Sequence, residues 1–364
     1  MRVESMTTRI ASFGAVAIAG LTLTACSTDS APQDAAQDAT IDIVASTSVW
    51  GDVVSAVVTD GGEVSAIVED SAIDPHSFEP SATDLAKGME ADMVVVGGGG
   101  YDAWLYEPLV NDGKEDKIVH ALPLVAHSHD HGDHDHAHGE EGHDHSHDAE
   151  GHDHDHAHGE EGHDHSHDAE GHDHDHAHEH GAESEGHEGH NHEHAIETVD
   201  GNEHIWFDVD AVSAVAEDIA TAAKEKSPEA KADAKPVTTR MDDLRTRLEA
   251  LPHAKVAQTE TIGDYLIDDS HLEDVTPDSY RQAALNHASP SAADLAAFLD
   301  KINNGEVDVL LYNPQTETDL TKRVHDAAVE KGVKIVEIGE VAPEGVNFLD
   351  YFEQVVSALE EATK

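Results

Sequence analysis

The chain has 364 residues and a formal net charge of -57, which comes from 20 Lys and Arg residues against 77 Asp and Glu residues. A protein this acidic repels nucleic acid and anionic membrane surfaces, so neither is expected as an electrostatic partner. The composition also includes 32 histidines. Because imidazole and carboxylate groups are both metal ligands, the composition points to cations as partners.

The N-terminus has the pattern of a secretory signal. Arg2 and Arg9 precede an apolar run over residues 10–23, which is short for a membrane span. The run ends at Cys26, the only cysteine, in a Leu-Thr-Ala-Cys sequence that resembles a bacterial lipobox. We therefore expect residues 1–25 to be a signal peptide, Cys26 to be lipidated, and residues 26–40 to form a flexible linker from the cell membrane.

From residue 41 onward, short apolar runs alternate with helical patterns. This alternation is typical of parallel sheets covered by helices, so the sequence predicts an α/β fold with two lobes, at residues 41–226 and 252–364. Strands are predicted at residues 41–44, 64–68, 93–96 and 117–119 in the first lobe and at 255–257, 307–312 and 333–338 in the second.

Two helices are predicted between these sets of strands, over residues 211–223 and 230–251. Pro236 is expected to kink or restart the second one. Residues 227–251 are the predicted rigid helix that joins the lobes. Open α/β sheets bind ligands beyond the carboxyl ends of their strands, so we expect a binding site in the cleft between the lobes.

Residues 127–194 consist almost entirely of His, Asp, Glu, Gly, Ala and Ser, and include a tandem duplication of Gly-Glu-Glu-Gly-His-Asp-His. This histidine tract has no apolar residues to bury, so a disordered loop inserted in the first lobe is predicted. The density of imidazole and carboxylate groups favours a low-affinity metal collector, and the alternative is a solvated spacer expanded by repeat slippage.

Two histidines outside the tract are candidate ligands of a specific site. His76 lies between Pro75 and Pro80, which stiffen a loop after the second predicted strand and before a helix that begins near Ser81. His204 is followed by Ile-Trp-Phe, so the fold can hold it in one place. The alternatives are an ordinary surface histidine for His76 and the end of the histidine tract for His204.

Two glutamates in the second lobe follow predicted strands. Glu260 comes after the strand at 255–257, and Glu340 after the strand at 333–338. Two histidines and two carboxylates would form a closed set suited to a bound ion without an open catalytic position. Asp264 and the segment Asn313-Pro314-Gln315 are alternatives to Glu340 as the fourth ligand, and either glutamate could instead be a charge at a helix N-terminus.

These features together resemble the zinc and manganese solute-binding proteins of ABC importers. The resemblance rests on the lipobox, Asp74-Pro75-His76, the histidine-rich insertion, His204-Ile205-Trp206 and the closing strand with Glu340. It implies two lobes joined by one long rigid helix, a metal ion bound between them by His76, His204, Glu260 and Glu340, and delivery to an ABC permease with its ATPase. A lipid-anchored monomer on the extracytoplasmic face of the bacterial membrane is also implied.

The identity of the metal depends on two opposing features. Zinc members of the family usually have a histidine where this chain has Glu260, and hard oxygen ligands favour Mn²⁺. The histidine tract between His76 and His204 favours Zn²⁺, which we therefore expect, with Mn²⁺ as the alternative.

Two other functions are alternatives to a receptor. A zinc enzyme is disfavoured because the sequence has no His-Glu-x-x-His pair, so we expect no enzymatic activity. A surface adhesin or metal buffer, with the lobes as a scaffold for the tract, predicts that deletion of residues 127–194 abolishes all metal binding.

Overall fold

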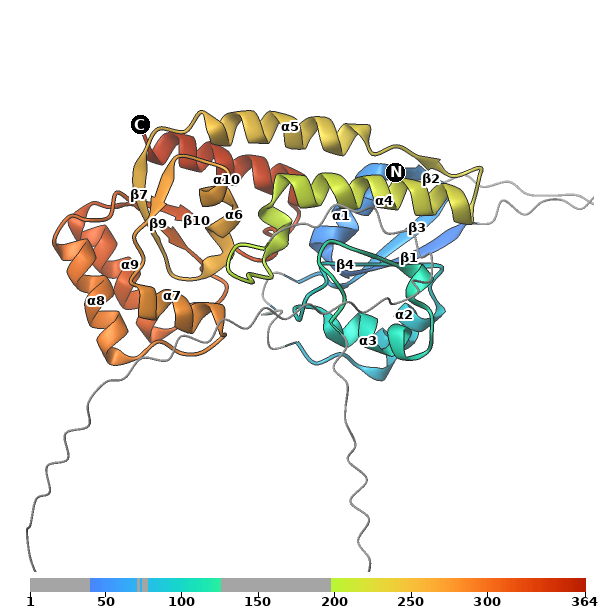
Figure 1. Cartoon of the computed structure of the whole chain (residues 1–364), viewed down its shortest axis with the longest axis horizontal. Helices are drawn as coiled ribbons and strands as arrows, with labels where there is room; N and C mark the ends of the chain where they lie inside the picture. Colours follow the sequence, from blue (N-terminus) through green and yellow to red (C-terminus); the bar gives the residue numbers. More distant parts are fainter. Residues whose placement is uncertain (1–39, 71–72, 74–77, 126–197) are drawn as a thin grey trace, which may run out of the picture. The chain divides into compact units, whose positions relative to one another are not determined.

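The computed structural model describes residues 40–70, 73, 78–125 and 198–364 (Figure 1). Residues Thr40–Lys364 form one compact unit. The predicted signal peptide, Cys26, His76 and the histidine tract lie outside the described residues. In the part of the chain that is described, no helix is both long and apolar enough to cross a membrane.

The first sheet is parallel and has the strand order β3-β1-β4-β5. Its register places Ile43 opposite both Val64 and Met93. Every residue of β4 is buried, as expected for a strand covered on both faces. The elements of this lobe are β1 (Ile41–Thr47), α1 (Ser48–Val57), β3 (Gly62–Val68), α2 (Ala82–Glu90), β4 (Met93–Val96), α3 (Ala103–Asn111), η2 (Glu115–Lys117), β5 (Ile118–His120), η3 (Ile205–Phe207) and α4 (Val209–Lys226).

The second sheet is also parallel and has the order β10-β9-β7-β8. Its elements are β7 (Ala254–Gln258), η4 (Thr261–Gly263), α6 (Asp264–Asp268), β8 (Leu272–Asp274), α7 (Asp278–Leu285), α8 (Ala292–Asn303), β9 (Val309–Tyr312), α9 (Asp319–Lys331), β10 (Lys334–Glu337) and α10 (Phe348–Ala362). The prediction of two α/β lobes with parallel sheets is confirmed, and each predicted strand overlaps an observed one.

The connecting helix α5 (Lys235–Glu249) begins later than predicted. Residues 231–232 form strand β6 (Lys231–Ala232), which pairs antiparallel with β2 (Val58–Asp60), so the helical start at residue 230 was wrong. Pro236 lies in the first turn of α5, where its fixed φ suits a helix start, so it begins the helix and does not kink or restart one that started at residue 230.

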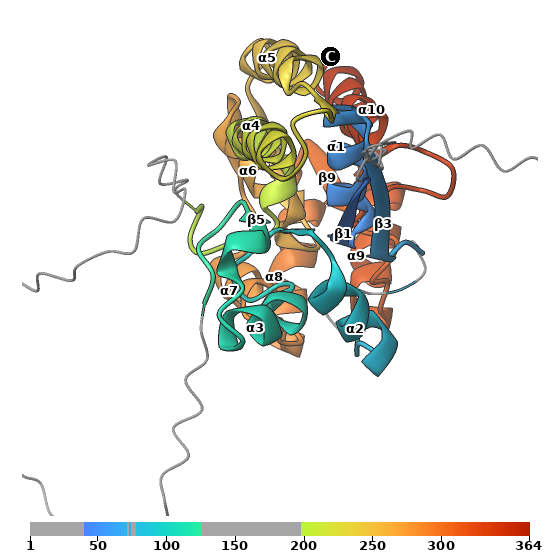
Figure 2. The same cartoon turned by 90° about the vertical axis from the view of Figure 1, so that its right-hand side faces the viewer.

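The α5 helix contacts α1, α4 and α10 (Figures 1 and 2). Arg240 forms ion pairs of 2.5 Å with Asp350 and Glu353 of α10, and Arg247 pairs with Glu360 at 2.8 Å. These pairs are partly exposed, so each contributes at most about 1 kcal/mol, and their main effect is to align the two helices.

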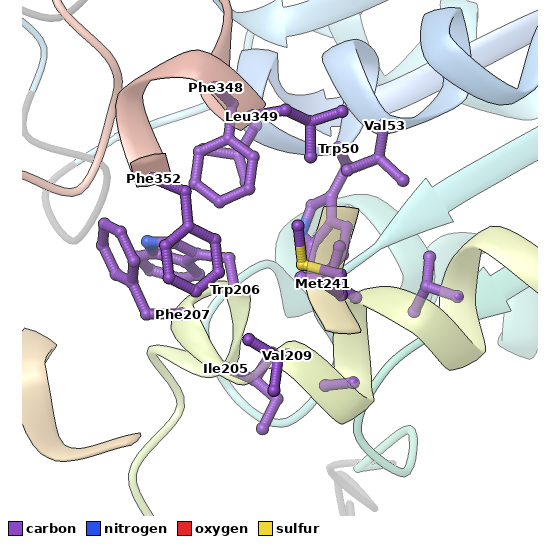
Figure 3. Close-up of a cluster of buried hydrophobic side chains, with 14 of the residues drawn as sticks. Trp50, Val53, Ile205, Trp206, Phe207, Val209, Met241, Phe348, Leu349 and Phe352 are labelled. Atoms are coloured by element: carbon purple, nitrogen blue, oxygen red, sulfur yellow. The ribbon is translucent and has the colours of Figure 1, made fainter. Parts of the chain in front are cut away.

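One hydrophobic core includes residues from both lobes (Figure 3). Phe207 of η3 packs edge-on against Phe352 of α10, with ring centroids 5.1 Å apart, and lies 5.9 Å from Phe348. The surrounding side chains come from α1, η3, the start of α4, α5 and α10, and those labelled in the figure are Trp50, Val53, Ile205, Trp206, Val209, Met241 and Leu349. This shared core fixes η3, and with it the residue before it, His204.

Candidate functional site

His204 is buried and held on two sides. It is 3% exposed and directly precedes η3. Its backbone N–H donates to Asn202 Oδ1 at 3.0 Å, and its ring Nδ1 lies 2.7 Å from the same oxygen. The ring packs edge-on against Trp206 with centroids 5.3 Å apart. A histidine held in this way belongs to the folded lobe rather than to the end of the histidine tract.

Glu340 lies in the loop after β10 and is 2% exposed. Its Oε2 accepts a hydrogen bond of 2.7 Å from the hydroxyl of Tyr101, which comes from the loop after β4 in the other lobe. Its backbone N–H donates to Gln315 Oε1 at 2.8 Å. At the preceding Gly339, a Cβ would lie 2.7 Å from the end of the Gln315 side chain, so a larger residue there would have to displace that side chain.

Glu260 is half-buried at the end of β7. Its Oε2 accepts hydrogen bonds from Asn313 Nδ2 and from the Thr316 hydroxyl, the latter at 2.7 Å. Both donors belong to the loop after β9, which also contains Gln315, the partner of Glu340. One loop therefore positions the two glutamates.

The alternative fourth ligands have other roles in the described structure. Asp264 accepts hydrogen bonds from Asn202 Nδ2 at 2.8 Å and Gln258 Nε2 at 2.5 Å, and pairs with Arg281 at 2.8 Å. Burial raises the pKa of Asp264, while Arg281 opposes that rise. Asn313 bonds Glu260, and Gln315 bonds both Glu340 and the carbonyl of Val341. These contacts favour Glu340, whose assignment as a ligand stays a prediction.

Tyr101 brings two of the predicted ligands to one place. Its hydroxyl binds Glu340, and its ring centroid lies 6.0 Å from that of His204. Among the described residues, no three His, Cys, Asp or Glu side chains form a group that could hold a metal ion. The predicted set of two histidines and two carboxylates would be completed by His76, which lies outside the described residues. The imidazole and carboxylate donors of this set suit a divalent metal ion.

A polar cavity of about 270 Å³ lies beside His204. Its walls come from the loop before η3 on one side and from η4 and the end of α7 on the other. The lining residues are Gly201, Asn202, Glu203, His204, Thr261, Leu285, Asn286 and His287. The cavity therefore borders His204 with groups from both lobes.

The loop that carries Tyr101 is built around the buried carboxylate of Asp102. Asp102 accepts hydrogen bonds from the Ser46 hydroxyl at 2.6 Å and from the N–H groups of Gly97 and Gly98 at 2.7 and 3.0 Å. At Gly98, φ is +81° and a Cβ would lie 2.1 Å from the carbonyl oxygen of Leu122, so only glycine fits. Desolvation raises the pKa of Asp102 to about 6.

Asp102 is expected to make stability depend on pH. Its folded pKa of about 6 exceeds the ordinary value of 3.8 for an aspartate, so the folded state binds the proton more tightly than the unfolded state. The free energy of unfolding therefore rises as pH falls from above 6 towards 4. Relative to Asp102→Asn, the native chain should gain about 2–3 kcal/mol over this window. Urea unfolding of both proteins at pH 4, 5, 6, 7.5 and 8.5 measures this difference. It should be constant between pH 7.5 and 8.5, and a difference that shrinks on acidification would contradict the assignment.

Sequence reasoning missed Tyr101 and Asn202. Tyr101 follows four consecutive glycines after a buried strand, a pattern typical of a backbone loop that approaches its neighbours closely. Asn202 lies two residues before His204 and could have been noted as a hydrogen-bond partner of a ligand histidine. No signal in the sequence linked either residue to the second lobe.

The family model of the periplasmic zinc-uptake complex component A, ZnuA, matches residues 43–362. No curated protein matches the sequence.

Several solved structures have a similar fold. A zinc-bound ZnuA deletion mutant is 16% identical, with a TM-score of 0.55 and coverage of 89% of this chain and 98% of its own. The laminin-binding protein Lmb of Streptococcus agalactiae, described as having adhesin and metal transporting activity, is 15% identical, with a TM-score of 0.53 and coverage of 89% and 100%. FpvC from Pseudomonas aeruginosa, solved in complex with Mn²⁺, is 18% identical, with a TM-score of 0.52 and coverage of 89% and 98%.

Proposed function

The chain belongs to the ZnuA family, the metal-binding periplasmic components of ABC importers, and from this premise we propose that it captures Zn²⁺ between its lobes and delivers it to a membrane permease. Capture requires ligands and no chemical step, which agrees with a family of solute-binding proteins. The permease and its ATPase are the proposed partners, and the proposed receptor is a monomer anchored to the membrane through Cys26.

The observation that carries this proposal is the convergence of His204 and Glu340 on Tyr101. The three residues come from different loops of both lobes, and two are buried ionisable groups of the kind that bind divalent ions. His204 and Glu340, together with His76 and Glu260, would form the proposed ligand set. Each histidine must be neutral to bind, so affinity should weaken at acidic pH.

Release is proposed to occur by local rearrangement of loops. The α5 helix packs against α1, α4 and α10, and η3 is fixed in the shared core, so large rotations of one lobe against the other would break many contacts. The loop with Glu340 is buried, and its hydrogen bonds with Gln315, Tyr101 and Tyr351 are the contacts that such a rearrangement would exchange. Superposition of metal-free and metal-bound structures with a large hinge rotation would refute this mechanism.

The preference between zinc and manganese is tested on the chain without residues 127–194. This deletion removes no residue whose contacts are described above, and the metal site of the lobes should remain. We expect one tight equivalent of Zn²⁺ that Mn²⁺ does not displace, measured by metal analysis and calorimetric titration with both ions in competition. Retention of Mn²⁺ over Zn²⁺ would instead support a manganese receptor, the alternative that Glu260 favours. If the chain without residues 127–194 bound no metal ion tightly, the histidine tract would be the metal-binding element, and the proposal of a receptor site between the lobes would be contradicted.

A further inference from the structure

Asn202 occupies a position between the two lobes, directly behind His204. It is 2% exposed; its side chain and carbonyl oxygen face His204 and the second lobe, and its backbone N–H donates to the carbonyl oxygen of Val199 at 2.9 Å. Its side-chain Nδ2 donates to the carbonyl oxygen of Thr261 at 2.6 Å and to Asp264 Oδ2 at 2.8 Å. Its carbonyl oxygen accepts a hydrogen bond of 2.5 Å from the Tyr265 hydroxyl.

These contacts determine which way the Asn202 amide points. A carbonyl oxygen accepts and cannot donate, so the atom 2.6 Å from the Thr261 oxygen must be the amide nitrogen. The amide oxygen Oδ1 then faces His204, where it accepts from the backbone N–H at 3.0 Å and lies 2.7 Å from ring Nδ1.

The orientation of Asn202 in turn fixes the protonation of the ring. Because an amide oxygen only accepts hydrogen bonds, His204 Nδ1 must carry a hydrogen. In the neutral ring the free lone pair is then on Nε2, and a neutral imidazole nitrogen with a lone pair is the form that binds metal ions. Without this acceptor the hydrogen could occupy either nitrogen, and only part of the population would be ready to bind.

Asp264, which anchors the amide, is itself held by the second lobe. Arg281 of α7 pairs with Asp264 and also with Asp200, each at 2.8 Å, and its Nε lies 3.4 Å from Asp274. The Arg281 side chain is 15% exposed, so these ion pairs are less screened than surface pairs. Gln258 Nε2 bonds the other Asp264 oxygen at 2.5 Å.

We infer that Asn202 is the positioning residue of the metal site: anchored by Thr261 and the Arg281–Asp264 pair, it fixes His204 with its hydrogen on Nδ1, so that the neutral ring has its lone pair on Nε2, the nitrogen that would bind the metal ion. This inference rests on the proposed function, because it assigns Asn202 a role in binding the transported ion. Partners that orient ligand histidines in this way typically change metal affinity by about 10–100-fold when they are removed.

The first measurement detects the ring hydrogen without metal. In the full chain labelled with ¹⁵N in histidine, a buried, hydrogen-bonded ring N–H exchanges slowly and gives a direct ¹H–¹⁵N signal, whereas exposed ring N–H groups exchange too fast. His120, whose Nδ1 lies 2.9 Å from the Leu122 carbonyl oxygen, should give a second signal. His204→Gln and His120→Gln assign the two. Asn202→Leu should remove only the His204 signal, and its persistence in that variant would overturn the inference.

The second measurement compares zinc affinity in Asn202→Leu and Asn202→Asp. The leucine removes the acceptor, so zinc affinity in competition with a strong chelator should fall about 10–100-fold. The aspartate keeps an acceptor for Nδ1 but places a second carboxylate beside Asp264, so it should retain the ring signal and most of the affinity while losing stability. If Asn202 had a purely structural role, the zinc affinity of each variant would follow its stability. Asn202→Asp would then bind zinc more weakly than Asn202→Leu.

The exposed Asn304→Leu serves as a matched control and should leave affinity unchanged. The inference is overturned if Asn202→Leu binds Zn²⁺ as tightly as the native chain. If the native chain binds no tight zinc equivalent, the proposed function fails, and the ring signal of the metal-free chain shows separately whether Asn202 fixes the tautomer.

Discussion

Replacing His204 by alanine is expected to abolish tight zinc binding by the lobes. The substitution removes a buried imidazole that Asn202 and Trp206 hold in one orientation, and His204 is the one predicted histidine ligand among the described residues. The loss should exceed the roughly 100-fold effect typical of removing a residue that only orients a ligand. Calorimetric titration of the chain without residues 127–194 measures it, and the same substitution in the full chain should leave only the weak sites of the histidine tract.

His271→Ala is the matched control, since His271 is an exposed histidine and is not a predicted ligand. It should bind one tight zinc equivalent as the native chain does. His76→Ala should resemble His204→Ala if the proposed ligand set is correct. If the His204→Ala variant still bound zinc tightly, the proposed metal site of the lobes would be contradicted.

Phe207→Ala is expected to give the largest loss of stability among single substitutions near the site, about 3–5 kcal/mol. The Phe207 side chain is fully buried between η3 and α10, where it packs against Phe348, Tyr351 and Phe352. Its removal leaves a cavity in the core that both lobes share, and the surrounding helices are linked too closely to fill it. Urea unfolding of the metal-free chain, followed by circular dichroism, measures the free energy of unfolding.

The same substitution at Phe78 provides the comparison. Phe78 is half-buried and packs edge-on against Trp104 at 5.0 Å, within one lobe. Its loss should cost clearly less than that of Phe207. Equal costs for the two substitutions would mean that the junction between the lobes is no more tightly packed than the surface of the first lobe.

The architecture could be predicted because strands buried on both faces have apolar runs. The apolar strands β4 and β9 lie within the predicted strands, and Pro236 lies at the start of α5, as its geometry requires. The strands β2, β6 and β8 were missed because they have two or three residues and mixed polarity, so their formation depends on partners distant in sequence. The late start of α5 has the same cause.

The candidate site was predictable only in part. His204, Glu260 and Glu340 could be singled out by residue type and by their positions beside predicted strands and apolar segments. Their partners could not, because the contacts join residues far apart in sequence: 62 residues separate Asn202 from Asp264, and 239 separate Tyr101 from Glu340. Such pairs are determined by the packing of loops from both lobes, which a local sequence pattern does not encode.

The core that contains Phe207, Trp50 and Phe352 has a consequence for how the chain folds. Two lobes with separate sheets would ordinarily be able to fold as independent units and to unfold in separate transitions. Here α10, at the end of the chain, packs against α1, near the start of the described residues, so neither half can complete its apolar packing before the other is made. Folding should therefore be cooperative across the two lobes, and neither lobe alone should form a stable binding site.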